Sequence, residues 1–417
     1  MNKKLISFAA VALVLAACSS EEPIAPPMVK NDAMGANPYR VSLTDALKNA
    51  DALLGELGEG ETTRSAERKV ESVEYYSRPG TRALGGDTLL YLVNYADDAG
   101  FALLSADSRL RPIYAISDEG SMSFSDTTYN KGLALFARGV ESDVENAIAS
   151  SPSISSPIDS LILMRRVVRE VEPLLNYYQS RMDQVYPYNM YCFDANGNSA
   201  YAGSAAVAIA AIMSYYKHPT SYAGYTFDWP SWNYGPNWGG VALLINLLGD
   251  SNNLQMQYGN TSSTSLASRI YPTFINMSYN GHQDLQDFSE TEICTILDNH
   301  SSNNLNTMGP VLVTGQRRVT NGIVGHAWVI DGYVQYEINS PVIGEGYVLE
   351  DVLFHCVWGW GGKCNGYFYW SNAQSLGGRP VETHPNDDYS SETINTYNIN
   401  IQYMGGFKKA YKFNPNL

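Results

Sequence analysis

Apolar residues in the N-terminal third of the chain follow first helical and then strand spacing. Spacing of three and four residues predicts helices at 42–57 and 129–149, the first of them opened by a capping box at Ser42. Apolar runs at 89–95 and 101–105 flank a turn of Asp, Ala and Gly and predict a β-hairpin. These segments predict a small α+β unit, and none of them has the residues of a catalytic site.

The pattern changes after residue 170, where helical segments come first and strands follow. A uniformly apolar run at 203–217 predicts a buried helix that ends before Pro219, and shorter helices are expected at 241–248 and 265–275. The remaining apolar runs have strand character and lie at 311–315, 326–333, 347–358, 366–370 and 394–403. We therefore expect an α+β fold with a helical half, an antiparallel β half and a cleft between them.

A stretch rich in Ser and Pro at 150–160 separates the two patterns and predicts a domain boundary. One domain is expected at 41–160 and a second at 170–417. Between them we expect an exposed basic segment that a protease can cut, at Arg165, Arg166 and Arg169.

The N-terminus has the pattern of an export signal. Two lysines precede an apolar run at 5–17 that is too short to span a bilayer, and Cys18 follows small residues directly. This arrangement resembles a bacterial lipoprotein signal, in which cleavage leaves the cysteine as the acylated N-terminus. An ordinary secretory signal with an incidental cysteine is the alternative. We expect a signal peptide at 1–18, a tether at 19–40, and a lipid anchor in the outer membrane or at the cell surface of a Gram-negative bacterium.

Charge and cysteine content narrow the range of partners and cofactors. The net charge is -15 and the sequence has no basic stripe, which argues against nucleic acid as a partner. Cys356 and Cys364 either form a disulfide in an oxidising compartment or remain free buried thiols. They lie close to His355, but four metal ligands at a usable spacing are not visible, so neither a metal nor another cofactor is expected.

Ser204 begins the predicted buried helix, and a helix N-terminus stabilises a thiolate or an oxyanion through its unpaired N–H groups. Far along the chain, His326 lies in a predicted strand, and a loop of Trp and Gly follows at 358–362. A residue at the start of a buried helix, a distant histidine and such a loop outline a papain-like thiol hydrolase, although position 204 carries a hydroxyl. Taken alone, His326 also fits a core histidine whose hydrogen bonds are satisfied.

Several short motifs occur in a fixed order over most of the second domain. They are Pro173-Leu174-Leu175, Met182-Asp183-Gln184, Pro187-Tyr188-Asn189, Gly203-Ser204-Ala205-Ala206, Ala210-Ala211-Ile212-Met213, Gly325 to Gly332 and His355 to Gly362. In these motifs the chain resembles the streptopain family of papain-like cysteine peptidases, from Pro173 to about Tyr403. The N-terminal unit resembles the inhibitory propeptide of the same family in its runs 92–95, 100–103 and 105–107.

The resemblance implies a papain-like fold and a role for each matching residue. Ser204 occupies the nucleophile position and His326 the general-base position. Gln184 is the implied oxyanion-hole side chain, and Trp358 is implied to pack beside the histidine. The implied partners are a peptide or protein in the cleft and the chain's own propeptide-like domain over it.

Several positions depart from the family pattern together. Ser204 replaces the catalytic cysteine. Ala211 replaces a glutamine, Val357 an asparagine and, further out, Met182 a tryptophan. A serine hydroxyl stays protonated where a thiol ionises, so it needs a base held in one orientation. Val357 removes a polar group near that base, and strand parity places Asp331 on the opposite face from the histidine.

These departures predict a surface peptidase homologue that has lost normal activity and binds peptide or protein in the retained cleft. Loss of the nucleophile lowers turnover in a triad enzyme by about a millionfold. In one alternative, Ser204 is the working nucleophile of a slow endopeptidase together with His326. In another, Ser204 is an engineered trap in an otherwise active enzyme, which the further changes at Ala211 and Val357 disfavour.

Overall fold

The computed structural model describes residues 39–57, 68–77, 88–125, 130–150, 164–229, 238–280, 284–298, 309–319, 322–339, 348–370, 399–404 and 408–409. The expected signal peptide, Cys18 and nearly all of the expected tether lie outside these residues, as does 151–163 at the expected domain boundary. The described residues belong to one compact unit, Asn37–Leu417. None of the helices among them is long and apolar enough to cross a membrane.

The N-terminal unit (residues 39–150) combines helices with an antiparallel sheet. Its elements are α1 (Leu43–Leu57), β1 (Val70–Ser77), β2 (Thr88–Tyr95), η1 (Ala96–Asp98), β3 (Phe101–Ser105), β4 (Ile113–Ser117) and α2 (Lys131–Ser150). Helix α1 begins where the sequence predicts, because Ser42 Oγ accepts a hydrogen bond from Asp45 N at 3.1 Å. The expected hairpin joins β2 to β3 and turns at Gly100, whose φ of +85° favours glycine.

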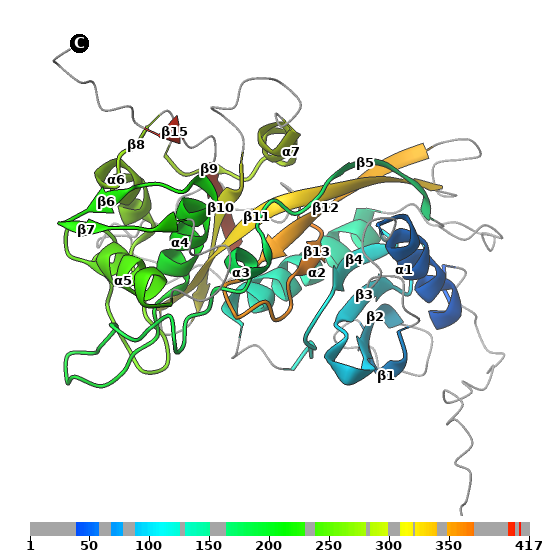
Figure 1. Cartoon of the computed structure of the whole chain (residues 1–417). Helices are drawn as coiled ribbons and strands as arrows, with labels where there is room; N and C mark the ends of the chain where they lie inside the picture. Colours follow the sequence, from blue (N-terminus) through cyan, green and yellow to red (C-terminus); the bar gives the residue numbers. More distant parts are fainter. Residues whose placement is uncertain are drawn as a thin grey trace, which may run out of the picture. The chain divides into compact units, whose positions relative to one another are not determined.

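The helical half follows in the chain. Its elements are α3 (Tyr177–Ser180), α4 (Ser204–Tyr216), β6 (Ser221–Tyr222), β7 (Tyr225–Thr226), α5 (Trp238–Gly249), η3 (Ala267–Arg269), α6 (Ile270–Asn276) and β8 (Tyr279–Asn280). Helix α4 is buried from Ala205 to Ser214, because α5 and the strand β11 (Gly322–Asn339) pack against it. Figure 1 shows α4, α5 and α6 gathered beside one end of β11.

The β half completes the fold. Besides β11, it consists of β9 (Gln286–Asp287), α7 (Glu290–Asp298), β10 (Val311–Val319), β12 (Val348–Val357), β13 (Gly366–Phe368), β14 (Ile399–Met404) and β15 (Lys408–Lys409). The main sheet has the order β1-β2-β3-β4-β13-β12-β11-β10-β14-β9, and β5 (Met164–Val171) pairs with β11. The expected α+β class, with a helical half and an antiparallel β half, is confirmed.

A main-chain ladder joins the N-terminal unit to the β half. Ser117 in β4 pairs with Gly366 in β13, and Ala115 pairs with Phe368. A Cβ atom on Gly366 would lie 2.3 Å from the carbonyl oxygen of Ile116, so only glycine allows this approach. The sheet therefore runs without a break from the N-terminal unit into the β half.

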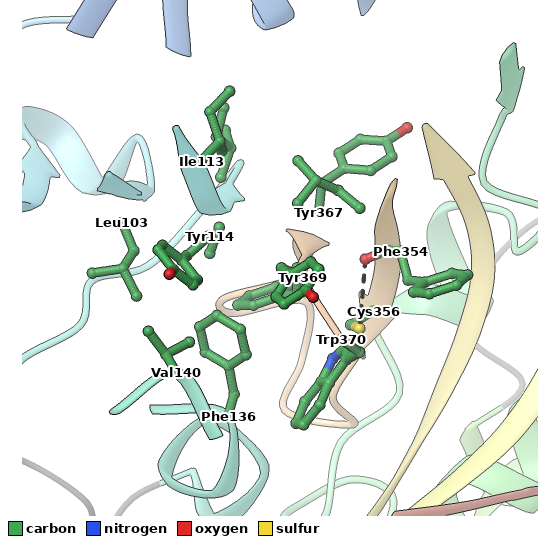
Figure 2. Packing of buried hydrophobic residues seen from close by; sticks show 14 of the residues in the cluster. Leu103, Ile113, Tyr114, Phe136, Val140, Phe354, Cys356, Tyr367, Tyr369 and Trp370 are labelled. Carbon is green, nitrogen blue, oxygen red and sulfur yellow. Dashed lines mark hydrogen bonds between the residues drawn. The ribbon is translucent and has the colours of Figure 1, made fainter. Parts of the chain in front are cut away.

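One apolar core spans the same junction. Residues of the N-terminal unit pack with residues of the β half in this core (Figure 2), namely Leu103, Ile113, Tyr114, Phe136 and Val140 with Phe354, Cys356, Tyr367, Tyr369 and Trp370. The Phe136 ring meets the rings of Phe368 and Trp370 edge to face, with centroids 5.0 and 5.5 Å away. A second core surrounds α4. The domain limits 41–160 and 170–417 stay a prediction, and the main core extends across both ranges.

The basic segment between the two expected domains is a strand. Arg166 and Arg169 lie in β5, whose main chain pairs with β11. Their side chains are exposed and form ion pairs, Arg166 with Glu337 at 2.9 Å and Arg169 with Asp298 at 2.5 Å. A peptidase takes up its substrate as an extended chain with free main-chain groups, and the pairing with β11 occupies those groups along one side. The segment is exposed as expected, but its place in the sheet disfavours cleavage at these two arginines.

Candidate active site

Ser204 is the first residue of α4, as the sequence predicts. Gly203 precedes it with a φ of +88°, and a Cβ atom there would lie 2.7 Å from the Met256 side chain, so the tight entry into the helix requires glycine. The Ser204 hydroxyl is half-buried, and its Oγ accepts a hydrogen bond from Ala327 N at 3.2 Å. Because Ala327 follows His326 in β11, this bond brings the helical half and the β half together at the two expected reactive residues.

His326 is a buried residue of β11, with 5% of its surface exposed. Its Nε2 donates a hydrogen bond to the carbonyl oxygen of Trp358 at 2.9 Å. The pKa of His326 is lowered to about 4. Burial is the main cause and the nearby Lys131 adds to it, while the hydrogen bond to the Trp358 carbonyl acts in the opposite direction. The imidazole is therefore neutral at pH 7. Because a carbonyl accepts only, the ring proton is on Nε2, and Nδ1 carries the free lone pair.

Aromatic rings surround the imidazole on the side of the β half. The ring of Trp328 stacks on His326 at a centroid separation of 6.4 Å, and the ring of Trp358 lies at 6.3 Å. The two indoles are themselves 5.3 Å apart, and both are fully buried. Trp358 thus lies beside the histidine, where the sequence resemblance puts it.

The N-terminal unit contacts the same histidine through the first turn of α2. A Cβ atom on Gly132 would lie 2.5 Å from His326 Cδ2 and 2.5 Å from Trp358 Cε3. Asn130 caps this helix, since its Oδ1 accepts a hydrogen bond from Leu133 N at 3.1 Å. The start of α2 therefore lies directly on the imidazole, and only a glycine at this position allows that distance.

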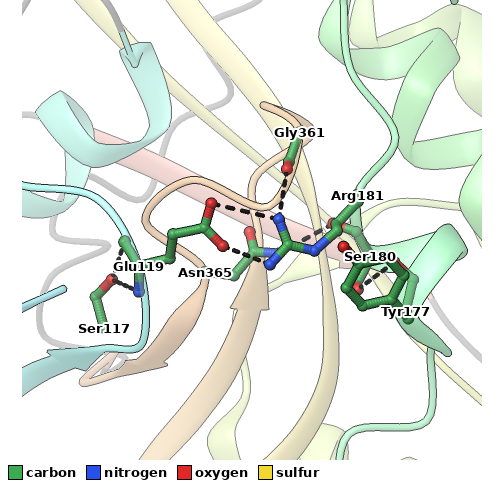
Figure 3. Close-up of polar contacts among 7 residues, drawn as sticks. All are labelled: Ser117, Glu119, Tyr177, Ser180, Arg181, Gly361 and Asn365. Atoms are coloured by element: carbon green, nitrogen blue, oxygen red, sulfur yellow. Dashed lines mark hydrogen bonds and ion pairs between the residues drawn. The ribbon is translucent and has the colours of Figure 1, made fainter. Parts of the chain in front are cut away.

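A second contact of the N-terminal unit reaches the loop after β12. Arg181 donates hydrogen bonds to the carboxylate of Glu119, which follows β4, and to the carbonyl of Gly361 at 3.3 Å (Figure 3). The main-chain oxygen of Glu119 also accepts a hydrogen bond from Cys364 N at 2.9 Å. Glu119 is thus held both by the loop that carries Trp358 and by the segment that leads to Gln184.

Gln184 lies close to the start of α4, because its carbonyl oxygen accepts a hydrogen bond from Ala202 N at 2.8 Å. The side chain is buried, and within the described residues its Nε2 has no hydrogen-bond partner. A buried amide donor without an acceptor is costly by about 1–3 kcal/mol. Such a donor fits the expected oxyanion-hole role, in which the acceptor belongs to a ligand.

Apart from Ser204, the positions that depart from the family pattern are apolar and packed. Met182, Ala211 and Val357 are buried in the core around α4. Val357 pairs with Val329 in the sheet, and the main-chain carbonyl of the next residue, Trp358, takes the hydrogen bond of His326. The sequence shows no side chain that could orient His326. In the structure, a main-chain carbonyl orients it instead.

Asp331 faces away from His326, as strand parity predicts, and forms a buried pair that the sequence analysis did not propose. Its Oδ1 lies 2.6 Å from His355 Nδ1, and its Oδ2 accepts a hydrogen bond from Leu175 N at 3.0 Å. The sequence contained a hint of this pair, because His355 and Leu175 both lie in the ordered motifs. The pair ties β11 and β12 to the segment that leads into the helical half.

All four described cysteines are free thiols, so of the two possibilities for Cys356 and Cys364 the structure has the unpaired one. Burial raises the pKa of the Cys192 and Cys364 thiols to about 11 and that of Cys294 to about 12. In the part of the chain that the structure describes, no three His, Cys, Asp or Glu residues gather as metal ligands.

Comparison with known families agrees with this geometry. The model of the Peptidase C10 family matches residues 182–239 and 235–368, which include Ser204 and His326. The part of the chain from 182 to 368 is therefore similar to the Peptidase C10 family. Residues 39–144 match the model of the Spi protease inhibitor family, so the N-terminal unit is a propeptide-type domain that packs on the peptidase fold.

Individual relatives are distant. The thiol protease/hemagglutinin PrtT of Porphyromonas gingivalis is 24% identical over 325 residues, which cover 70% of this chain and 35% of that protein. The chain thus spans about a third of the length of this relative. A prointerpain A fragment of Prevotella intermedia is 18% identical, with a TM-score of 0.49, and the match covers 80% of this chain and 98% of the fragment. Active interpain A from the same organism is 20% identical, with a TM-score of 0.37 over 57% of this chain and 94% of that one.

Proposed function

We propose that this chain is an exported Peptidase C10 homologue that binds peptide or protein between its helical and β halves and has lost normal peptidase activity. One observation carries the proposal. A serine hydroxyl occupies the nucleophile position at the start of α4, and the histidine of the general-base position is buried and neutral.

The charges at this pair support loss of activity. A cysteine peptidase relies on a thiolate that an adjacent imidazolium stabilises. With a pKa of about 4, His326 is not an imidazolium at neutral pH. Ser204 also stays protonated, because its hydroxyl is far less acidic than a thiol. Neither half of the usual ion pair is present.

The retained donors support binding. The buried Nε2 of Gln184 has no acceptor among the described residues, and the free N–H groups of a helix N-terminus lie at Ser204. Both favour a carbonyl or a carboxylate oxygen of a bound peptide. The propeptide-type unit covers the histidine through Gly132, so peptide binding is proposed to require movement of the α2 turn.

Turnover of a general protein substrate tests the proposal. The wild-type chain is expected to show no measurable turnover, and Ser204→Cys to restore part of it. The double change Ser204→Cys and Val357→Asn is expected to exceed the single change, since an added polar support near a catalytic group contributes about 1–3 kcal/mol, or roughly ten- to a hundredfold in rate. Clear turnover by the wild-type chain, lost in Ser204→Ala, contradicts the proposal.

A second candidate function is endopeptidase activity with Ser204 as the nucleophile. The tautomer of His326 favours it, because a neutral imidazole with a free Nδ1 is the form that accepts a proton from serine. Turnover that survives thiol-blocking reagents and disappears in both Ser204→Ala and His326→Ala would establish this function.

The proposed location is the outer membrane or the cell surface, with a lipid on Cys18. Support comes from the N-terminal pattern of two lysines, a short apolar run and small residues before the cysteine. A lipid on Cys18 and the expected tether at 19–40 would keep the rest of the chain at the membrane surface.

A further inference from the structure

His326 lies at the end of a series of hydrogen bonds that leaves the expected site. Its Nε2 donates to the carbonyl of Trp358 at 2.9 Å, and the N–H of the same tryptophan donates to Asn365 Oδ1 at 3.1 Å. Asn365 Nδ2 in turn donates to the carbonyl of Ser180 at 3.0 Å. Figure 3 shows Asn365, at the end of the loop between β12 and β13, bonded to Ser180. The series connects the histidine to the segment that leads to Gln184.

The Asn365 side chain holds the N–H of Trp358, and so the peptide that directly precedes the one carrying the Trp358 carbonyl. It is buried, with 8% of its surface exposed, and both ends of its amide are satisfied. Only one orientation of the amide gives an acceptor to Trp358 N and a donor to Ser180 O. The main chain of Asn365 closes the loop as well, because its N donates to the Gly362 carbonyl at 3.1 Å.

The carbonyl that His326 contacts lies in the peptide after Trp358, beyond the last paired residue of β12, Val357. Gly359 follows with a φ of +74°, a turn that leaves the Trp358 carbonyl dependent on its neighbours for direction. The apolar side chain of Val357 offers no hydrogen bond to the imidazole or to this peptide. Within the described residues, the Trp358 carbonyl is therefore the group that orients His326 by a hydrogen bond, in addition to the rings packed against the imidazole.

We infer that Asn365 is the positioning residue of His326: by holding the N–H of Trp358 and bridging to Ser180, it fixes the backbone of Trp358. The carbonyl of that residue then sets the tautomer and orientation of His326, which a side chain at position 357 does not. The inference rests on the proposed function only in assigning His326 to the general-base position. It assigns to Asn365 an indirect role, through the main chain, and no contact with a substrate.

Nitrogen NMR of the full chain, labelled with ¹⁵N at histidine, tests this role. The chain has six histidines, and the signals of His326 are those missing from His326→Gln. In the wild type, Nε2 is expected to give a protonated signal and Nδ1 an unprotonated one. Asn365→Leu and Asn365→Ser, which lose the bridge, are expected to give averaged signals from a mixture of tautomers. Asn365→Asp keeps an acceptor for Trp358 N but loses the donor to Ser180 O, so its signals are expected to lie between those of the wild type and Asn365→Leu.

Asn94 provides the matched control. It is also a buried asparagine with both ends of its amide bonded, to Met122 N and Met122 O at 2.9 Å each, but it lies in β2 of the N-terminal unit. Asn94→Leu is expected to lower the melting temperature and leave the His326 signals unchanged. Unchanged signals in a folded Asn365→Leu or Asn365→Ser variant, or an equal change in Asn94→Leu, would overturn the inference. Wild-type peptidase activity would refute the proposed function without affecting this measurement.

Discussion

At the residue scale, the protonation of His326 follows from its surroundings. The first turn of α2 and two indole rings exclude water from the imidazole, and one carbonyl is its hydrogen-bond partner. A carbonyl is a weaker partner for an imidazolium than a carboxylate, so it does not offset the loss of hydration. Burial therefore prevails, and the ring stays neutral down to a pH of about 4.

Acidification is expected to destabilise the chain through this residue. The pKa of His326 is about 4 in the folded chain and 6.5 in an unperturbed histidine. Its contribution to stability is therefore full above pH 6.5 and falls as the pH drops toward 4, because the unfolded chain binds a proton that the folded chain does not. From pH 7 to pH 5, loss of the His326 contribution should lower the free energy of unfolding of the wild type by about 2 kcal/mol. His326→Gln should not show this part of the decrease. Urea unfolding at both pH values measures this, and an identical pH dependence in the two proteins would show that burial does not depress this pKa.

At the element scale, two helix starts meet at the expected site. Helix α4 begins at Ser204 in the helical half, and α2 begins beside His326 in the N-terminal unit. Glycine is needed on both, Gly203 for the turn into α4 and Gly132 for the approach of α2. The contact of α2 is therefore sensitive to a single methyl group.

Gly132→Ala is expected to push the start of α2 away from His326. The added Cβ would lie 2.5 Å from two ring atoms, and overpacking of this kind destabilises by about 1–3 kcal/mol. In the Ser204→Cys background, alkylation of the introduced thiol should become faster when Gly132→Ala is added. Gly55→Ala in α1 is the matched control, because nothing lies within 4 Å of the Cβ it would add and alanine favours a helix. Equal alkylation rates in the two variants would mean that α2 does not limit access to the site.

At the scale of the whole molecule, the propeptide-type unit and the peptidase part share one sheet and one core. Strands β4 and β13 are paired, and Phe136 packs against Phe368 and Trp370. Separation would expose this core and two strand edges to water, which is unfavourable. We therefore propose that the unit over His326 remains attached in the functional protein.

The purified full-length chain is expected to keep its full mass during prolonged incubation. Cleavage near Arg166 or Arg169 requires a reactive nucleophile and release of β5 from β11, and both are disfavoured. Intact-mass spectrometry over several days measures this. Spontaneous cleavage at these arginines that disappears in His326→Ala would contradict both the retained unit and the proposed loss of activity.

Anchoring is tested in cells of the native host. An alkyne fatty acid is expected to label the wild-type chain and not Cys18→Ala, because the cysteine thiol and the new N-terminus carry the lipids in a lipoprotein. Equal labelling of both proteins would show that the lipid is not on Cys18, and absence of label from both would leave an ordinary secretory signal.

The sequence alone determined most of the local elements. Periodicity placed α1, α4 and the strand with His326, strand parity turned Asp331 away from that histidine, and ordered motifs indicated the family. These features are local, so spacing and residue type specify them. Only the tertiary structure showed the carbonyl of Trp358 on His326, Gly132 on the same ring and the pairing of β4 with β13. Main-chain carbonyls and glycines have no side chain whose type could reveal such contacts in a sequence. The pairing of two strands some 250 residues apart depends on long-range packing rather than on the pattern of either strand.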